Sequence, residues 1–157
     1  MFLRTLIKKE NFMDRESYNE KAINDAYKNA HIALQSISDL LPEVRDEKMK
    51  KELEKESKGY QKIIAEISAY MKGKGMTPQD INFFKKAMLW SSVKMKTLFD
   101  GSLNNIAEMM IKGTVTGITE LTAMVNEKKN LDEEVAELIV KLLETEEKYE
   151  EDLKKFL

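Results

Sequence analysis

The chain has 157 residues, with 26 Lys and Arg, 28 Asp and Glu, one His and no Cys. This length is typical of a single domain. The absence of Cys excludes disulfides, Cys-ligated zinc, iron–sulfur clusters and thiol catalysis. A single His excludes any site that needs two imidazoles from one chain. The formal net charge of −2 gives no overall reason to bind nucleic acid, so we expect no nucleic-acid partner.

Residues 1–12 do not have the pattern of a signal peptide, because Arg4 interrupts the apolar run and no small-residue cleavage site follows. No stretch approaches the roughly 18–20 apolar residues of a membrane span. Lys9-Glu10 can be encoded as AAG-GAG, a bacterial ribosome-binding sequence, two codons before Met13. Two interpretations stay open: translation starts at Met13, or the N-terminal residues form a short disordered tail.

The first predicted helix begins at Ser17-Tyr18-Asn19-Glu20, which has the Ser-x-x-Glu pattern of a capping box. We therefore expect a tail over 1–16 and a helical bundle over 17–157. Apolar residues then recur at spacings of three and four and predict one buried face of a helix that ends near Pro42. These residues are Ile23, Ala26, Tyr27, Ala30, Ala33, Leu34, Ile37, Leu40 and Leu41.

The second predicted helix runs from about Val44 to Lys72, and Gly73 and Gly75 end it. Its apolar face has a polar gap at Glu56 and Ser57. The inward residues are Met49, Leu53, Tyr60, Ile63, Ile64, Ile67 and Tyr70.

Three further helices are predicted. Thr77-Pro78 is typical of a helix start and opens a shorter helix that runs to Phe99. A break at Asp100-Gly101-Ser102 then precedes a helix from Ser102 to Lys128, in which Gly113 and Gly117 let another helix approach closely. The last helix opens at Leu131-Asp132 and directs inward Val135, Leu138, Ile139, Leu142, Glu146, Tyr149, Leu153 and Phe156.

Four long helices of similar length, with short connections at 42–43 and 129–131, predict two antiparallel hairpins. Residues 73–100 are enough to cross the bundle from end to end. Two hairpins joined by one long crossover is the connectivity of ferritin-type bundles rather than of a plain up-down bundle.

The last helix carries the most specific pattern, over residues 146–153. It is similar to the Glu-x-x-His-x-x-x-Leu of the final helix in the ferritin-like superfamily, with Tyr149 where His belongs. The chain resembles small rubrerythrin-like bacterial members of unassigned function. This resemblance implies an all-α, ferritin-like antiparallel four-helix bundle with a helical crossover between the second and third long helices, in a bacterial cytoplasm.

The family's carboxylate-bridged di-iron or di-manganese site needs a Glu from each of two helices and a Glu-x-x-His from each of the other two. Only Glu146 matches this pattern cleanly. On the second helix, the Glu-x-x-His positions are occupied by residues 57–60, Ser-Lys-Gly-Tyr, so both ligands are missing. On the first helix, the position of the Glu ligand falls near Leu34 or Gln35, and neither is a carboxylate. Glu108 and Glu120 flank the middle of the fourth helix without occupying it.

We therefore expect no cofactor and a central polar cluster in which tyrosine hydroxyls, which usually find a partner when buried, bond to neighbouring polar groups. Its expected members are Gln35, Ser57, Tyr60, Glu146 and Tyr149. The alternative is a non-standard iron or manganese site, possessing oxidoreductase activity if it is an enzyme. Its candidate ligands are Glu146, Glu56, His31, Tyr149 and Tyr60.

Residues 81–99 form a basic, aromatic-rich amphipathic stretch. We expect this stretch to pack across the bundle, with docking to a membrane or a partner as the alternative. Its apolar residues spread over two faces, and an element of that kind usually buries one face against a second surface. A homodimer contact through Phe83, Phe84, Trp90 and Met95 is therefore expected.

These observations favour a non-enzymatic structural or interaction protein whose di-metal site has been lost. The metal-binding and docking functions remain as alternatives.

Overall fold

The computed structural model describes residues 1–78, 100–127 and 130–157, and the side chains of 11–13 also lie outside the described residues. The described chain contains four long helices and no strand, which confirms the all-α prediction. The helices are α1 (Phe2–Leu40), α2 (Glu47–Gly73), α4 (Leu103–Asn126) and α5 (Glu133–Lys154), and a 3-10 turn η1 (Leu41–Glu43) follows α1.

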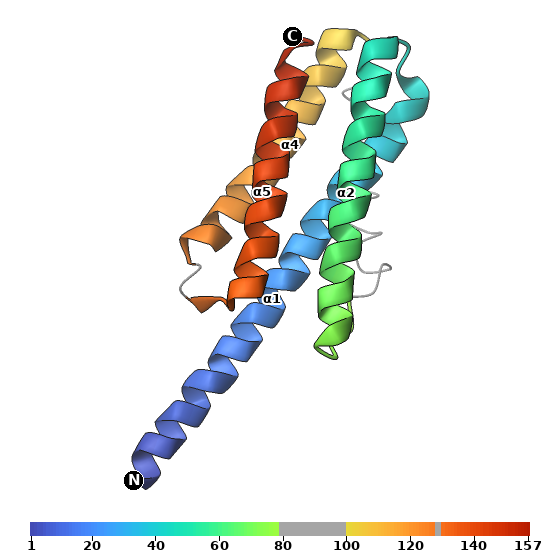
Figure 1. Ribbon diagram of the computed structural model, residues 1–157. Helices are drawn as coiled ribbons and strands as arrows, with labels where there is room; N and C mark the ends of the chain where they lie inside the picture. Colours follow the sequence, from blue (N-terminus) through green and yellow to red (C-terminus); the bar gives the residue numbers. More distant parts are fainter. Residues whose placement is uncertain (79–99, 128–129) are drawn as a thin grey trace.

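The four helices pack against one another as two hairpins (Figure 1). The first hairpin pairs α1 with α2, and the second pairs α4 with α5. Contacts of α2 with α5, and of α1 with α4 and α5, join the two hairpins. The end of α2 and the start of α4 lie at opposite ends of the bundle in Figure 1.

Local capping chemistry accounts for the helix ends. The carboxylate of Asp46 accepts a hydrogen bond from the Met49 N–H at 2.8 Å and so caps the start of α2. Beyond α2 the chain turns at Gly75, whose φ of 69° favours glycine. Gly101 has a φ of 77°, and the hydroxyl of Ser102 caps α4 by accepting from the Asn105 N–H. The predicted ends of these helices are confirmed to within about three residues.

The predicted start of the first helix is wrong. α1 begins at Phe2, so Ser17 and Glu20 lie in the interior of a 39-residue helix and cap nothing. Residues 2–16 contain neither Gly nor Pro, and a helix that meets no breaker continues through a Ser-x-x-Glu pattern. Residues 2–16 are helical in the structure, whereas the assignment of 1–16 as a tail and the start of translation at Met13 stay predictions.

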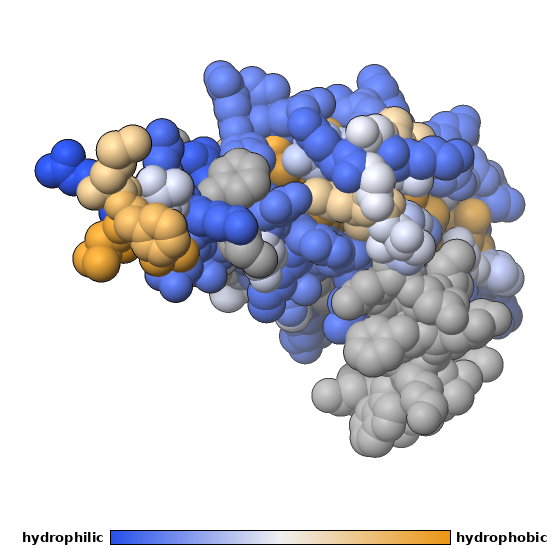
Figure 2. All heavy atoms as spheres, turned by 90° about the horizontal axis from the view of Figure 1, so that it is seen from below, coloured by the Kyte–Doolittle hydropathy of each residue, from blue (hydrophilic) through white to orange (hydrophobic). Residues whose placement is uncertain are grey.

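The first turns of α1 project beyond the other helices (Figure 1). Their apolar side chains are exposed, with Phe2 at 82% and Leu3 at 73% (Figure 2, orange spheres on the left). Contact with the bundle begins further along, where Arg15 lies 3.3 Å from the carboxylate of Asp132. One turn later, the side-chain oxygen of Asn19 accepts a hydrogen bond from the backbone N–H of Asp132 at 2.7 Å.

The core draws apolar side chains from all four helices, and almost all residues predicted to face inward are buried or partly buried. Gly113 is an exception, because it is exposed and has no neighbour close to the position of a Cβ. The largest fully buried side chains are Ile23, Ile37, Met49, Leu53, Tyr60, Ile67, Met71, Leu121, Ile139, Leu142 and Leu153.

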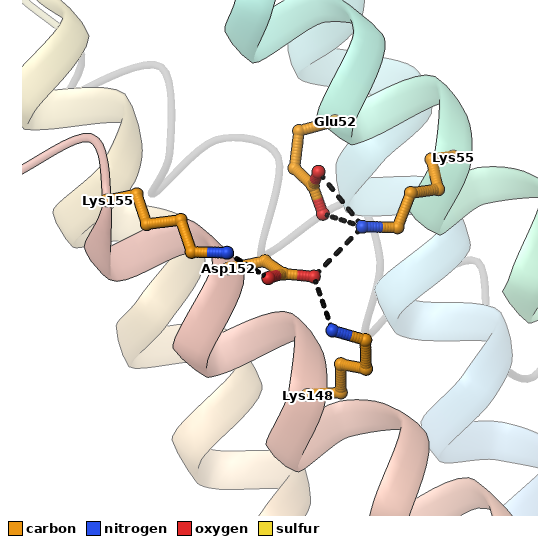
Figure 3. Close-up of polar contacts among 5 residues, drawn as sticks. All are labelled: Glu52, Lys55, Lys148, Asp152 and Lys155. Atoms are coloured by element: carbon orange, nitrogen blue, oxygen red, sulfur yellow. Dashed lines mark hydrogen bonds and ion pairs between the residues drawn. The ribbon is translucent and has the colours of Figure 1, made fainter.

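An ion-pair network ties α2 to α5 (Figure 3). The carboxylate of Asp152, with its side chain only 8% exposed, binds Lys55 at 2.9 Å, Lys148 at 3.3 Å and Lys155 at 2.6 Å. Lys55 in turn binds Glu52 at 2.7 Å. Hydrogen bonds from Lys155 and Lys55 hold the pKa of Asp152 well below its usual range.

We expect Asp152→Asn to lower the free energy of unfolding by about 1–2 kcal/mol, because three lysines lose their shared counter-ion. Urea denaturation at neutral pH measures this loss. The control is Lys154→Ala, which removes exposed pairs to Glu150 and Glu151 and should cost less than about 0.5 kcal/mol. Equal losses in both variants would contradict a special role for the network.

Candidate functional site

A buried carboxyl lies at the centre of the bundle. Glu146 of α5 is 1% exposed, and its Oε1 accepts a hydrogen bond of 3.2 Å from the hydroxyl of Tyr60 on α2, which is 2% exposed. The structure thus brings together two of the residues that the sequence placed in a central polar cluster.

Gly117 of α4 makes room for this carboxyl. A Cβ at position 117 would lie 2.5 Å from Oε2 of Glu146, closer than real Cβ atoms approach such a neighbour. The backbone oxygen of Gly117 accepts a hydrogen bond of 3.2 Å from the Asn29 side chain on α1. All four helices therefore contribute to the surroundings of the carboxyl. Within the described chain, Oε2 of Glu146 has no hydrogen-bond partner.

Tyr149 also lies in this region, against α2. Its ring meets that of Tyr60 edge to face, with centroids 5.4 Å apart and planes at 62°. Its hydroxyl occupies the place where Gly59 would carry a Cβ. The two glycines, Gly59 and Gly117, thus make room for side chains from α5.

Burial changes the titration of Glu146. The pKa of the Glu146 carboxyl is raised to about 8, mainly by burial and also by the nearby Glu120 carboxylate. The hydrogen bond from Tyr60 acts in the opposite direction and lowers the pKa. Burial and the neighbouring carboxylates Glu146 and Glu56 also raise the pKa of Tyr60 well above its ordinary value. The centre of the bundle therefore holds neutral groups at pH 7.

Glu56 of α2 is a second buried carboxyl, 1% exposed, with its Oε1 unpartnered among the described residues. The pKa of Glu56 is raised to about 8, mainly by burial and also by the Glu52 and Asp152 carboxylates, while Lys55 acts to lower it. The sequence marked Glu56 as part of a polar gap, but the structure encloses it within the bundle.

His31 lies on α1, half-buried, with its ring 4.4 Å from that of Tyr27 at 64°. Its Nε2 has no hydrogen-bond partner in the described chain, and burial lowers the pKa of the imidazole. This ring contact is with a neighbour one turn away on the same helix.

Two expected members of the central cluster do not join it. Gln35 is exposed, and its amide donates to Asp39 at 2.8 Å. Ser57 accepts a long hydrogen bond of 3.5 Å from Gln61. Because consecutive helical residues are turned by about 100°, Ser57 points away from the face that buries Glu56.

The described residues do not fit a di-metal centre. No three His, Asp or Glu side chains within 1–78, 100–127 and 130–157 come close enough together to hold a metal ion. Oε1 of Glu146 accepts a hydrogen bond from the Tyr60 hydroxyl, and its Oε2 lies against the backbone of Gly117. A carboxylate-bridged di-metal centre in a four-helix bundle uses four carboxylates and two imidazoles that converge.

A cavity of about 280 Å³ opens beside Glu146, between α1 and α4. Glu146 and Tyr60 line it, as do the polar side chains of Asn29, Thr114 and Glu120. Its other lining residues are Ile32, Ala33, Ser36, Leu40, Met109, Met110, Gly113, Thr116 and Gly117.

The predicted interface residues Phe83, Phe84, Trp90 and Met95 lie outside the described residues, as does the whole stretch 81–99. None of the described helices is both long and apolar enough to cross a membrane.

Sequence reasoning missed Asn29, Gly59 and Asp152 as contributors to this region. Gly59 offered a signal, because a glycine in the middle of a 27-residue helix weakens that helix unless something occupies the space it leaves. Asn29 and Asp152 offered a weaker one, as polar residues adjoining apolar positions on predicted helices.

We expect Gly117→Ala to destabilise the protein, because the new methyl group collides with the Glu146 carboxyl. Gly113→Ala, one turn earlier in the same helix, should instead stabilise it by up to about 1 kcal/mol through helix propensity. Thermal unfolding of both variants tests the pair. Stabilisation by both substitutions would contradict the placement of Glu146 against α4.

Glu146 and Glu56 predict a loss of stability with rising pH. Each carboxyl has a folded-state pKa near 8 and an ordinary value of 4.5, so its stabilising contribution is full below the ordinary value and is lost as the pH rises through the folded value. Between about pH 6.5 and about pH 8.5, each should cost about 2 kcal/mol of unfolding free energy. His31, with its lowered pKa, acts only below this window.

Glu146→Gln should remove about half of this loss, as measured by urea denaturation at the two pH values. Glu144→Gln, at an exposed position on α5, is the matched control and should leave the pH dependence unchanged. An identical pH dependence in Glu146→Gln and the parent would show that the carboxyl is not buried in neutral form.

Comparison with protein-family models, with curated proteins and with solved structures finds no match to this chain.

Proposed function

We propose that this chain is a ferritin-like helical bundle protein with a non-enzymatic, structural or interaction role. In this proposal the place of a di-metal centre is taken by a cluster of tyrosine and protonated glutamate. The observation that supports it is the hydrogen bond between Tyr60 and Glu146 at the centre of the bundle. The second oxygen of the Glu146 carboxyl lies against Gly117.

The arrangement of the described helices agrees with ferritin-like connectivity. Two helical hairpins are joined by a connection between opposite ends of the bundle (Figure 1). Such connectivity distinguishes ferritin-like bundles from plain up-down bundles. The proposal extends this arrangement to the family's antiparallel topology, in a soluble bacterial protein.

The chemistry of the centre supports a role without catalysis. Glu146 and Glu56 are neutral at pH 7, since the pKa of each is raised to about 8. A neutral carboxyl is a poor metal ligand, because metal binding requires the deprotonated form. The Tyr149 ring further fills the space beside Tyr60.

Metal binding is the competing function, and the unpartnered atoms His31 Nε2, Glu56 Oε1 and Glu146 Oε2 favour it. We expect protein purified without chelator to contain iron and manganese far below one ion per chain. Inductively coupled plasma mass spectrometry measures this. Stoichiometric metal that is lost in Glu146→Gln but retained in Glu144→Gln would overturn the proposal in favour of a carboxylate–tyrosine metal site.

Docking through residues 81–99, which lie outside the described residues, is the remaining alternative. Its test is flotation with anionic liposomes, with Trp90→Ala as the control. If the protein does not associate with the liposomes, docking to a membrane is excluded. The homodimer contact through the same stretch stays a prediction.

A further inference from the structure

The cavity between α1 and α4 combines an apolar body with one unsatisfied acidic group. Its volume of about 280 Å³ is at the small end of the range of ligand pockets. Ile32, Leu40, Met109 and Met110 provide aliphatic walls. Met side chains adapt readily to the shape of an apolar occupant.

Glu146 supplies the acidic group. The residue is 99% enclosed, its Oε1 is engaged by Tyr60, and its Oε2 has no donor among the described residues. In the ionised form of the carboxyl this unpartnered acceptor costs free energy, so a donor that enters the cavity gains more than it would in water. Gly117, which carries no side chain, leaves this oxygen its space.

The Ser and Thr hydroxyls around the cavity have already used their donors. Thr114 donates to the Met110 carbonyl at 2.8 Å, Ser36 to the Ile32 carbonyl at 2.9 Å, and Thr116 to the Lys112 carbonyl at 3.0 Å. Their oxygens remain as acceptors. The Asn29 amide donates one of its two N–H groups to the Gly117 carbonyl.

No Lys, Arg or His is found among the cavity's described lining residues, whereas Glu120 adds a second carboxylate at an exposed position. A lining of acceptors and negative charge with apolar walls selects against anions. It favours an occupant that donates hydrogen bonds, carries a positive charge and has an aliphatic body.

We infer that this cavity is a binding site for a small aliphatic ammonium ion, whose charged group contacts Oε2 of Glu146 and whose hydrocarbon chain lies along Met109 and Met110. This function goes beyond a structural or interaction role and does not depend on ferritin-like ancestry. The described residues that line the cavity come from α1, α2, α4 and α5.

Binding is coupled to one proton. The pKa of Glu146 is raised to about 8 by burial, so at pH 7 the carboxyl is largely protonated and an incoming ammonium ion displaces that proton to solvent. The titratable groups that face the carboxyl are Tyr60 from α2 and Glu120 from α4, and the cavity-lining residues of α1 are uncharged. Affinity should therefore rise with pH up to that pKa.

The test is isothermal titration calorimetry of the whole chain with n-pentylamine at about pH 8.5, where the carboxyl is ionised and the amine is still charged. We expect saturable binding at one site per chain. Glu146→Gln keeps the volume of the side chain and should weaken binding roughly tenfold to a hundredfold through loss of the charge-assisted hydrogen bond. Glu108→Gln, exposed on α4 and outside the cavity lining, is the matched control and should bind as the parent does.

Two further ligands of equal chain length separate the alternatives. 1-Pentanol should bind at least tenfold more weakly than pentylamine, and pentanoate should not bind detectably. Equal binding of pentanol and pentylamine would overturn the inference, because the cavity would then select only for apolar volume. Absence of pentylamine binding would also overturn it and would leave water as the occupant.

Manganese(II) provides the remaining outcome. Displacement of pentylamine by Mn²⁺ in a manner that depends on Glu146 would overturn the inference and identify a metal site. Failure of the amine alone, with no metal bound, would leave the proposed structural role intact. The two proposals therefore fail on different measurements.

Discussion

The burial of the Glu146 carboxyl is the constraint around which the centre of this bundle is built. A carboxylate removed from water without a partner is expensive, so the chain must either pair it or keep its proton on. Both occur in the described residues: Tyr60 donates a hydrogen bond to one oxygen of Glu146, and the pKa of Glu146 is raised to about 8. Gly117 then becomes necessary, because any side chain there would occupy the space that Oε2 takes.

The same constraint gives the bundle a polar interior without a metal. Helical bundles commonly fill their centres with apolar side chains, as Ile23, Ile67 and Ile139 do here. Among such side chains this chain also buries the two glutamates Glu56 and Glu146 and the tyrosines Tyr60 and Tyr149. Each carboxyl retains one unpartnered oxygen within the described chain. Buried polar groups without a hydrogen-bond partner are rare in native proteins and often have a functional role. The unpartnered oxygen of Glu146 therefore supports the assignment of a ligand to the cavity.

Much of the fold could be predicted from local chemistry. Gly75, Gly101 and Ser102 mark helix ends because positive φ and side-chain capping are properties of a few neighbouring residues. The start of α1 could not be read from the capping box at Ser17, because that pattern forms a cap only where the preceding residues leave the helix. Whether they leave depends on the stability of residues 2–16 as helix, and no breaker interrupts them.

The candidate site was predictable only in part, for a geometric reason. Tyr60, Glu146 and Tyr149 were found because their spacing placed them on inward faces. Gln35 was assigned to the same face, but its helix is rotated so that the side chain reaches solvent and Asp39. The cavity beside Glu146 and the meeting of Asp152 with Lys55 depend on how far apart helices from different parts of the sequence settle. A single sequence carries little information on that distance.

The seating of the Tyr149 hydroxyl at Gly59 has a mechanical consequence. If α5 slid along α2 by one residue, about 1.5 Å, the hydroxyl would meet a position that carries a side chain. The bond between Lys55 and Asp152 opposes the same axial movement. The interface between α2 and α5 therefore resists axial sliding. By contrast, α1 and α4 lie on either side of the cavity and are joined by the hydrogen bond between Asn29 and Gly117. An occupant that widens the cavity should therefore change the separation of α1 and α4 more than that of α2 and α5.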